Sequence, residues 1–303
     1  MKMGAKMGAI SQRQKRKNRE GMLLVMPAIL ILLLTFAIPL LYSFFISLSD
    51  SASVVGNRLE FVGIANYLSV IGSSRFREAL FHTCFFVLMT LLFEFLIGFV
   101  IALLLHCETK GARVFKLIFA IPLMVAPVVS GLQWRWLFAD QYGLINYLLS
   151  LLGIKAPLWF ASAAASWVTV IVANLWLATP FVILVLLAGL GGLPEELNEA
   201  ARIDGAGRWQ VFFRITLPQL KPTILIILVI RITDAFRIYD LIYILTGGGP
   251  GGRTEVLSTY IYKTTFTDWK FGQGSAASFL VMLIICAISF ICNKVMTGKE
   301  EDR

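Results

Sequence analysis

The sequence predicts an all-α integral membrane protein with about six transmembrane helices and a cytoplasmic loop that folds into short helices. Three observations predict this fold class. The chain has 303 residues, of which 58% are apolar and only 15% are charged. The apolar residues gather into six long runs that are nearly free of charge. The basic residues gather in the segments between alternate runs.

The composition excludes an ordinary soluble domain, since soluble proteins are about 45–50% apolar and about 25% charged. The formal net charge of +9 could suggest nucleic acid as a partner. However, the basic residues before the first run are not interleaved with aromatic side chains, which stack on bases in nucleic-acid sites. They are typical of a cytoplasmic tail. We therefore expect contact with membrane lipid and no nucleic acid.

The first apolar run, residues 22–48, would extend about 40 Å as a helix. This is roughly twice the apolar core of a signal peptide, and no small-residue cleavage site follows it, so we expect a retained helix. Each later run is long enough to cross a bilayer, which takes about 20 residues. These runs are residues 80–105, 114–138, 166–190, 222–245 and 276–296.

Lysine and arginine counting gives the orientation, because cytoplasmic segments hold an excess of both. With the N-terminus inside, 17 of these residues fall on the cytoplasmic side and seven on the other side. We expect both termini in the cytoplasm. The chain then divides into a basic tail (1–21), a first transmembrane helix (22–48), an extracytoplasmic loop (49–75), a membrane core (76–293) with a cytoplasmic loop (191–221), and a cytoplasmic C-terminus (294–303).

The cytoplasmic loop predicts a helix, a sharp bend and a second short helix. Pro194 suits the first turn of a helix, with acidic residues following it. Gly205 can take the left-handed conformation that ends a helix, and Pro218 closes the second helix. From these features alone, the loop could dock on a partner protein or lie on lipid headgroups.

The same loop resembles the "EAA" signature of importer-type ABC permeases. Glu199-Ala200-Ala201 is followed by Gly205 at the family's spacing, and then by Ile215-x-Leu217-Pro218. The resemblance implies that the first helix of the loop is a coupling helix, seated in a groove of a separate ATPase. The residues that it implies for ATPase coupling are Glu199, Ala200, Ala201, Asp204, Gly205, Ile215, Leu217 and Pro218.

The resemblance extends over about residues 76–293. The stretches 234–240, 243–250, 260–262, 271–277 and 134–146, together with Thr254, are similar to carbohydrate-type permeases such as those of the maltose and glycerol-phosphate importers. It implies a type I ABC importer permease fold in a prokaryotic inner membrane. It also implies a second homologous permease, two ATP-binding cassette subunits and an extracytoplasmic solute-binding protein as partners. ATP and Mg²⁺ would be bound by the partner ATPase, with no cofactor on this chain.

Charged residues inside the membrane are costly unless they are paired or hydrated. The fifth run carries Arg231, Asp234, Arg237 and Asp240 at a spacing of three, which makes them neighbours on a helix. They could form a self-neutralising ladder or line a hydrated pathway for a polyhydroxylated solute. Glu94 in the second run could pair with Arg135 in the third or face the partner permease.

A sugar pathway combines carboxylates and amides, which bind hydroxyls, with rings that cover apolar faces. Tyrosines near a span end could supply such rings, although they are typical membrane-boundary anchors as well. The candidate substrate-pathway residues are Glu94, Asn174, Asp234, Arg237, Tyr239, Asp240 and Tyr243.

Several motifs are absent from the sequence. There is no Gly-x-x-x-x-Gly-Lys-Ser/Thr phosphate loop, no zinc-protease motif and no nucleophile elbow. The four cysteines show no metal or redox spacing. We therefore expect a non-catalytic subunit without a metal site. Two alternatives stay open: an ion-coupled carrier that works alone, with Glu94 or Asp234 binding the driving proton or sodium ion, and a membrane enzyme or anchor without a transported solute.

Overall fold

The computed structural model describes residues 20–22, 24–50, 60–106 and 111–297. This part of the chain is predominantly helical, and its strand-like pairing is a single bridge between Ser49 and Phe61. Four helices are long and apolar enough to cross a membrane: Glu20–Ser47, Ser74–His106, Ala163–Gly191 and Phe271–Cys292. Two further bent pairs raise the number to six if each pair is one span. The all-α membrane fold predicted from the sequence is confirmed.

The third apolar run is sharply bent, which corrects the single straight span expected over residues 114–138. It folds as α6 (Ala112–Ala120), the 3₁₀ turn η2 (Ile121–Met124) and α7 (Pro127–Leu137). The two helical parts, Val114–Met124 and Pro127–Leu137, meet at 100°. Val125 between them has an extended backbone. Pro122 and Pro127, on either side of it, lack the amide hydrogen that a helical hydrogen bond needs.

The fifth run is also interrupted, so the single helix expected over residues 222–245 is wrong. α13 (Lys221–Phe236) ends at Phe236, and α14 (Asp240–Leu245) begins after a short non-helical link. Tyr239 in the link has φ −126° and ψ −60°, outside the helical region. The chain before α13, Arg208–Gln219, is itself bent from α13 by 63°.

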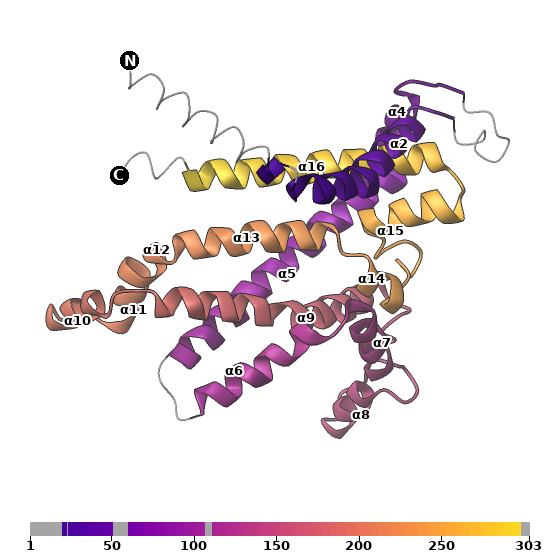
Figure 1. Cartoon of the computed structure of the whole chain (residues 1–303). Helices are drawn as coiled ribbons and strands as arrows, with labels where there is room; N and C mark the ends of the chain where they lie inside the picture. Colours follow the sequence, from indigo (N-terminus) through magenta and orange to yellow (C-terminus); the bar gives the residue numbers. More distant parts are fainter. Residues whose placement is uncertain (1–19, 23, 51–59, 107–110, 298–303) are drawn as a thin grey trace, which may run out of the picture.

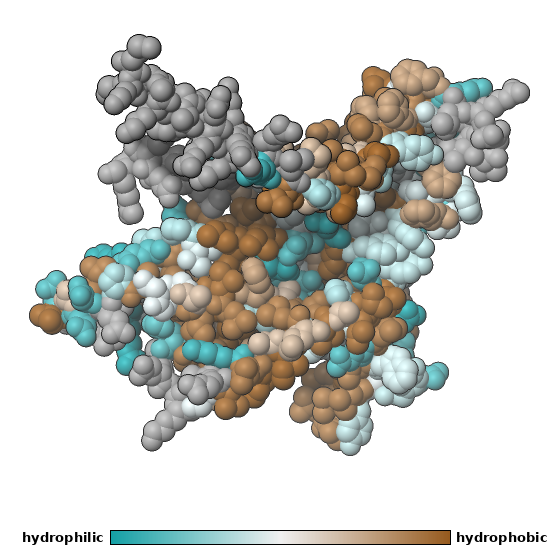
Figure 2. Space-filling model, viewed as in Figure 1, coloured by the Kyte–Doolittle hydropathy of each residue, from teal (hydrophilic) through white to brown (hydrophobic). Residues whose placement is uncertain are grey.

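The core of the bundle is built where α5 (Ser74–His106) and α9 (Ala163–Gly191) cross. Gly98 makes the crossing close, because a Cβ there would come within 2.7 Å of Val182 on α9. In the candidate spans, 50% of the apolar window of α9 is buried, but only 17% of that of α16 (Phe271–Thr297). The outer helices therefore expose apolar side chains over a broad belt, as lipid-facing helices do (Figure 2).

The N-terminal helix packs on the outside of this bundle. Its described parts include the π-helical turn η1 (Leu33–Ala37) and α2 (Ile38–Ser47), which contacts α16. The ring centroids of Phe44 on α2 and Phe279 on α16 are 5.4 Å apart. The rest of its apolar surface is exposed, as it is on helices that face lipid.

The connections sort to two ends of the bundle (Figure 1). α10 and the end of α16 lie at one end. The other end holds α7, α14 and the short helices α4 (Ala65–Gly72), α8 (Leu144–Leu151) and α15 (Leu257–Tyr262), the last continued by the π-helical turn η4 (Lys263–Thr267). Each candidate site below belongs to one of these ends or to the helices between them.

Candidate functional site: a projecting helical loop and an intramembrane polar cluster

Short helical pieces connect α9 to α13 and project from one end of the bundle (Figure 1). Gly205 has φ 81°, the left-handed conformation that the sequence predicts. The amide of Ala206 donates to the carbonyl of Ala201 at 2.9 Å and closes the first piece. The connection is thus a helix, a glycine turn and a second helical segment. Its pieces are α10 (Glu195–Ile203), α11 (Arg208–Val211), η3 (Phe212–Thr216) and α12 (Leu217–Gln219).

The second segment is anchored on the bundle core. The π-helical turn η3 ends at Thr216, two residues before Pro218, whose ring and missing amide hydrogen do not fit a regular α-helical turn. The ring of Phe212 lies 6.2 Å from that of Phe99 on α5. Leu220, which is fully buried, joins a core cluster with Ala102 of α5 and Leu186 of α9. A movement of the loop would therefore be transmitted to α5 and α9.

The sequence-predicted coupling residues occupy this connection in two groups. Ala201 is buried, while Ile215 and Leu217 are half-buried and hold the second segment. Glu199 and Ala200 point outward from α10. The exposed members are Glu199, Ala200, Asp204, Gly205 and Pro218. α10 thus offers a carboxylate beside small side chains, a surface that another protein can approach closely.

A polar cluster lies inside the bundle and joins α5, α9 and α13. Glu94 on α5 is fully buried. Its Oε2 accepts from Arg231 Nε at 2.9 Å, and its Oε1 accepts from Arg231 Nη2 at 3.0 Å. Asn174 Nδ2 on α9 donates to the same Oε1 at 2.9 Å. The paired charges and the amide satisfy one another, with the Glu94 side chain 0% exposed and that of Arg231 10% exposed.

This cluster corrects the two pairings considered from the sequence. Arg135 does not meet Glu94; its Nη1 donates to the carbonyl of Ile244 at 2.7 Å. The charge ladder has one ion pair among the described residues, from Arg231 Nη1 to Asp234 Oδ2 at 3.2 Å. Because α13 ends at Phe236, the helix does not carry the ladder on to Asp240.

Asp234 differs from Glu94 in its access to solvent. Its side chain is 56% exposed, whereas that of Glu94 is 0% exposed. Glu94 has both oxygens engaged by buried donors, so a driving proton or sodium ion has no free carboxylate there. Asp234 binds Arg231 through Oδ2, and its side chain stays open to solvent.

An open pocket of about 350 Å³ lies at the break between α13 and α14. This volume is within the range of small-molecule sites, about 300–1,000 Å³. Three tyrosines meet beside it: the Tyr239 ring stacks on that of Tyr243 at 5.2 Å, and Tyr262 of α15 lies 5.1 Å from Tyr239. The lining residues are Phe236, Arg237, Tyr239, Ser258, Ile261, Tyr262, Phe266 and Val281.

Some of the substrate-pathway residues predicted from the sequence lie at the pocket, and other pocket residues were not predicted. Arg237 and Tyr239 line it, and Tyr243 stacks on Tyr239 from α14. Asp240 is exposed at the start of α14, and Glu94 and Asn174 lie in the separate buried cluster. Sequence reasoning missed Tyr262 and Phe266, which come from α15 and η4. The sequence offered one signal for them: the two aromatic residues are four positions apart, which places them on the same face of a helix.

The family follows from a comparison with known proteins. A family model described as "Binding-protein-dependent transport system inner membrane component" matches residues 22–297. The chain belongs to this family. It is therefore a multi-pass transport component of the inner membrane, and the importer resemblance seen in the sequence is confirmed.

Relatives within this permease family match over nearly the whole chain. The chain is 35% identical to the trehalose/maltose transport system permease protein MalF of Thermococcus litoralis, covering 94% of this chain and 96% of that one. It is 33% identical to the trehalose transport system permease protein SugA of Mycobacterium tuberculosis, covering 92% and 89%.

The fold matches that of a solved importer. A bacterial alginate ABC transporter, in complex with alginate pentasaccharide-bound periplasmic protein, has a chain that superposes with a TM-score of 0.81 at 22% identity. The match covers 94% of this chain and 96% of that one. At this identity, the likeness confirms the ABC importer permease fold.

Proposed function

We propose that this chain is the permease subunit of an ATP-driven, binding-protein-dependent sugar importer. The family match over residues 22–297 carries this proposal, and relatives that are named for trehalose and maltose transport support the solute class. ATP and Mg²⁺ are bound by two partner ATP-binding cassette subunits, so this chain is not itself an enzyme. A second homologous permease and an extracytoplasmic solute-binding protein complete the importer.

The α9–α13 connection is the proposed docking element for an ATPase subunit. Glu199 and Ala200 are exposed on α10, while Phe212 and Leu220 anchor the following segment on α5 and in the core. Docking on α10 would therefore push directly on the helices that carry the buried cluster. Such a two-state element can couple ATP binding to a change in the bundle. With α10 on the cytoplasmic side, where the ATPase subunits lie, both termini of the chain are cytoplasmic as well.

The tyrosine-lined pocket and the exposed charges beside it form the proposed solute pathway. Sugars present apolar ring faces and hydroxyl groups, which suit tyrosine rings and charged side chains respectively. Tyr239 and Arg237 line the pocket, and Asp234 lies exposed one turn before Arg237 on α13. The ion pair from Arg231 to Asp234 at 3.2 Å ties these exposed charges to the buried Glu94 cluster.

Purification of the native assembly tests the proposal. The chain is expressed with its chromosomal neighbours, extracted in mild detergent and captured by an affinity tag, and the retained proteins are identified by mass spectrometry. We expect a second six-span permease and a subunit with a phosphate loop. Recovery of the chain alone, in a form that is active without ATP, would contradict the proposal.

Gly205→Val is expected to uncouple ATP hydrolysis from transport. A Cβ at Gly205 meets no atom within 4 Å, so its cost comes from the positive φ, roughly 1–2 kcal/mol for a non-glycine residue. Relief of that strain would misalign α10 and α11. The measurement is transport per ATP hydrolysed in the assembled complex. Gly207→Val is the matched control, because Gly207 has φ −68°; equal behaviour of the two variants would refute the role of the bend.

A further inference from the structure

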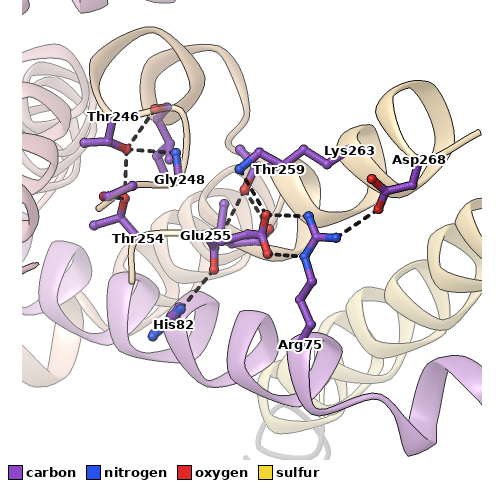
Figure 3. A network of polar contacts seen from close by, with 12 residues as sticks. Arg75, His82, Thr246, Gly248, Thr254, Glu255, Thr259, Lys263 and Asp268 are labelled. Carbon is purple, nitrogen blue, oxygen red and sulfur yellow. Dashed lines mark hydrogen bonds and ion pairs between the residues drawn. The ribbon is translucent and has the colours of Figure 1, made fainter. Parts of the chain in front are cut away.

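A carboxylate clamp joins segments that are far apart in the sequence (Figure 3). It lies at the start of α15, at the end of the bundle opposite α10 (Figure 1). Arg75 at the start of α5 donates to Glu255 through Nε at 2.7 Å and through Nη2 at 3.0 Å. Its Nη1 reaches Asp268 Oδ2 at 3.0 Å, beyond η4. Lys263 Nζ lies 3.2 Å from Glu255 Oε1. The buried Glu255 carboxylate therefore ties α5 to the start of η4, and Arg75 itself ties α5 to the residue after η4.

The backbone around Glu255 is fixed on the same face of α5. His82 Nδ1 is hydrogen-bonded to the carbonyl of Glu255 at 3.0 Å, and Thr83 Oγ1 accepts from the amide of Leu257 at 2.9 Å. Because His82 and Thr83 lie two helical turns beyond Arg75, three points of α5 hold the start of α15. Arg75 also lies over the ring of Tyr260 on α15, 5.4 Å from its centroid.

The clamp is charged at neutral pH. Burial alone would raise the pKa of Glu255, but hydrogen bonds and attraction from Arg75, with the charge of Lys263, hold that pKa below its ordinary value. A depressed carboxyl pKa means that the clamp is intact at neutral pH and is lost only as the pH falls through that lowered value. The side chain of Glu255 is 6% exposed and that of Arg75 is 41% exposed.

The helix fixed by the clamp forms one wall of the tyrosine-lined pocket. Ser258, Ile261 and Tyr262 of α15 and Phe266 of η4 line it. The hydroxyl of Ser258 donates to the carbonyl of Ile238 across the break between α13 and α14. The wall is therefore held on its outer side by the clamp and on its inner side by that bond, and it presents Tyr262 to Tyr239.

We propose that Glu255 is a positioning residue for the solute pathway. Through Arg75 and Lys263 it fixes the α15–η4 wall, so that Tyr262 and Phe266 keep their places beside Tyr239 and Arg237 in the lining of the pocket. Glu255 itself does not line the pocket. The inference rests on the proposed function, since it assigns the wall a solute to contact.

The test measures the position of the wall in the full complex in lipid nanodiscs. The four native cysteines are replaced by serine, and Tyr239→Cys and Tyr262→Cys are introduced together. The rate of bridging by a short bifunctional methanethiosulfonate is then followed by mass spectrometry. We expect Glu255→Gln to slow bridging about tenfold, from the loss of charge-assisted hydrogen bonds. Glu255→Asp, which keeps the charge, should retain most of the rate.

Arg253→Gln is the matched control, because Arg253 lies two residues away on the same loop and is exposed. The double-cysteine complex that carries Arg253→Gln should be cross-linked at the same rate as the double-cysteine complex without it. A second measurement uses the native tyrosines and labelled trehalose or maltose: Glu255→Gln should raise the KM for uptake about tenfold, the same factor expected for the clamp's hydrogen bonds, while ATP hydrolysis without solute is unchanged.

Unchanged bridging in Glu255→Gln would overturn the inference. So would equal loss of assembled complex in the Gln and Asp variants, because that pattern indicates a general folding role. Bridging reports the wall position whether or not a sugar is carried. Failure of the unmodified complex to import any sugar would instead count against the proposed function.

Discussion

Glu94→Ala is expected to be the most destabilising single substitution in the bundle, costing about 3–5 kcal/mol. The side chain of Arg231 is only 10% exposed, and it donates twice to Glu94. Removal of that carboxylate leaves a buried guanidinium without its main partner, and Asn174 loses its acceptor as well. Thermal unfolding of the purified complex in detergent, followed by tryptophan fluorescence, measures the loss.

Asp234→Asn is the matched control for this cluster. It removes the other ion pair of the same arginine, but the Asp234 side chain is 56% exposed, so the expected cost is at most about 1 kcal/mol. Equal decreases in unfolding temperature for Glu94→Ala and Asp234→Asn would mean that burial of the ion pair does not determine the loss of stability. A Glu94→Ala complex as stable as the unmodified one would mean that Arg231 finds another partner.

Glu199→Lys is expected to abolish import while the protein still inserts in the membrane. Glu199 is exposed on α10 and has no core contact to lose, so the fold should tolerate lysine. In a docked assembly the reversed charge would face the same partner groups as before, and a mispaired interface charge weakens binding by more than about tenfold. The measurement is ATP-dependent uptake together with retention of the ATPase subunit during purification.

Glu78→Lys provides the same change of charge at the other end of the bundle, at an exposed position on α5. It should leave both uptake and ATPase retention intact. Normal uptake by Glu199→Lys would remove Glu199 from the coupling surface. Loss of uptake in both variants would point to a general effect of added positive charge.

Local chemistry made the membrane helices and the projecting loop predictable. Long apolar runs are selected by the bilayer, and Gly205 permits the positive φ that ends α10. The prediction that Pro218 closes the second helix is wrong, because α12 continues through Pro218 to Gln219; proline is tolerated in the first turn of a helix. The interruptions were harder to foresee. Prolines mark the bend near Val125, but the break at Tyr239 has neither proline nor glycine, and it depends on how α14 packs against α7 and α9.

The pairings could not be read from spacing along the chain. The partners Glu94 and Arg231 are 137 residues apart, and the choice of Arg231 over Arg135 follows from the crossing of α5 with α13. No spacing in the sequence singles out Arg75, yet it closes the clamp on Glu255, 180 residues away. These contacts depend on how the helices pack against one another, and that packing cannot be read from the sequence of any one helix.

The most direct test of the account is uptake by the reconstituted importer with its energy sources separated. Proteoliposomes containing this chain, its partner permease and the ATPase subunits receive labelled trehalose or maltose with the solute-binding protein outside. We predict uptake that requires enclosed ATP and the binding protein, and that persists when proton and sodium gradients are collapsed by ionophores. Uptake by this chain alone, driven by an ion gradient without ATP, would contradict the account and establish an ion-coupled carrier.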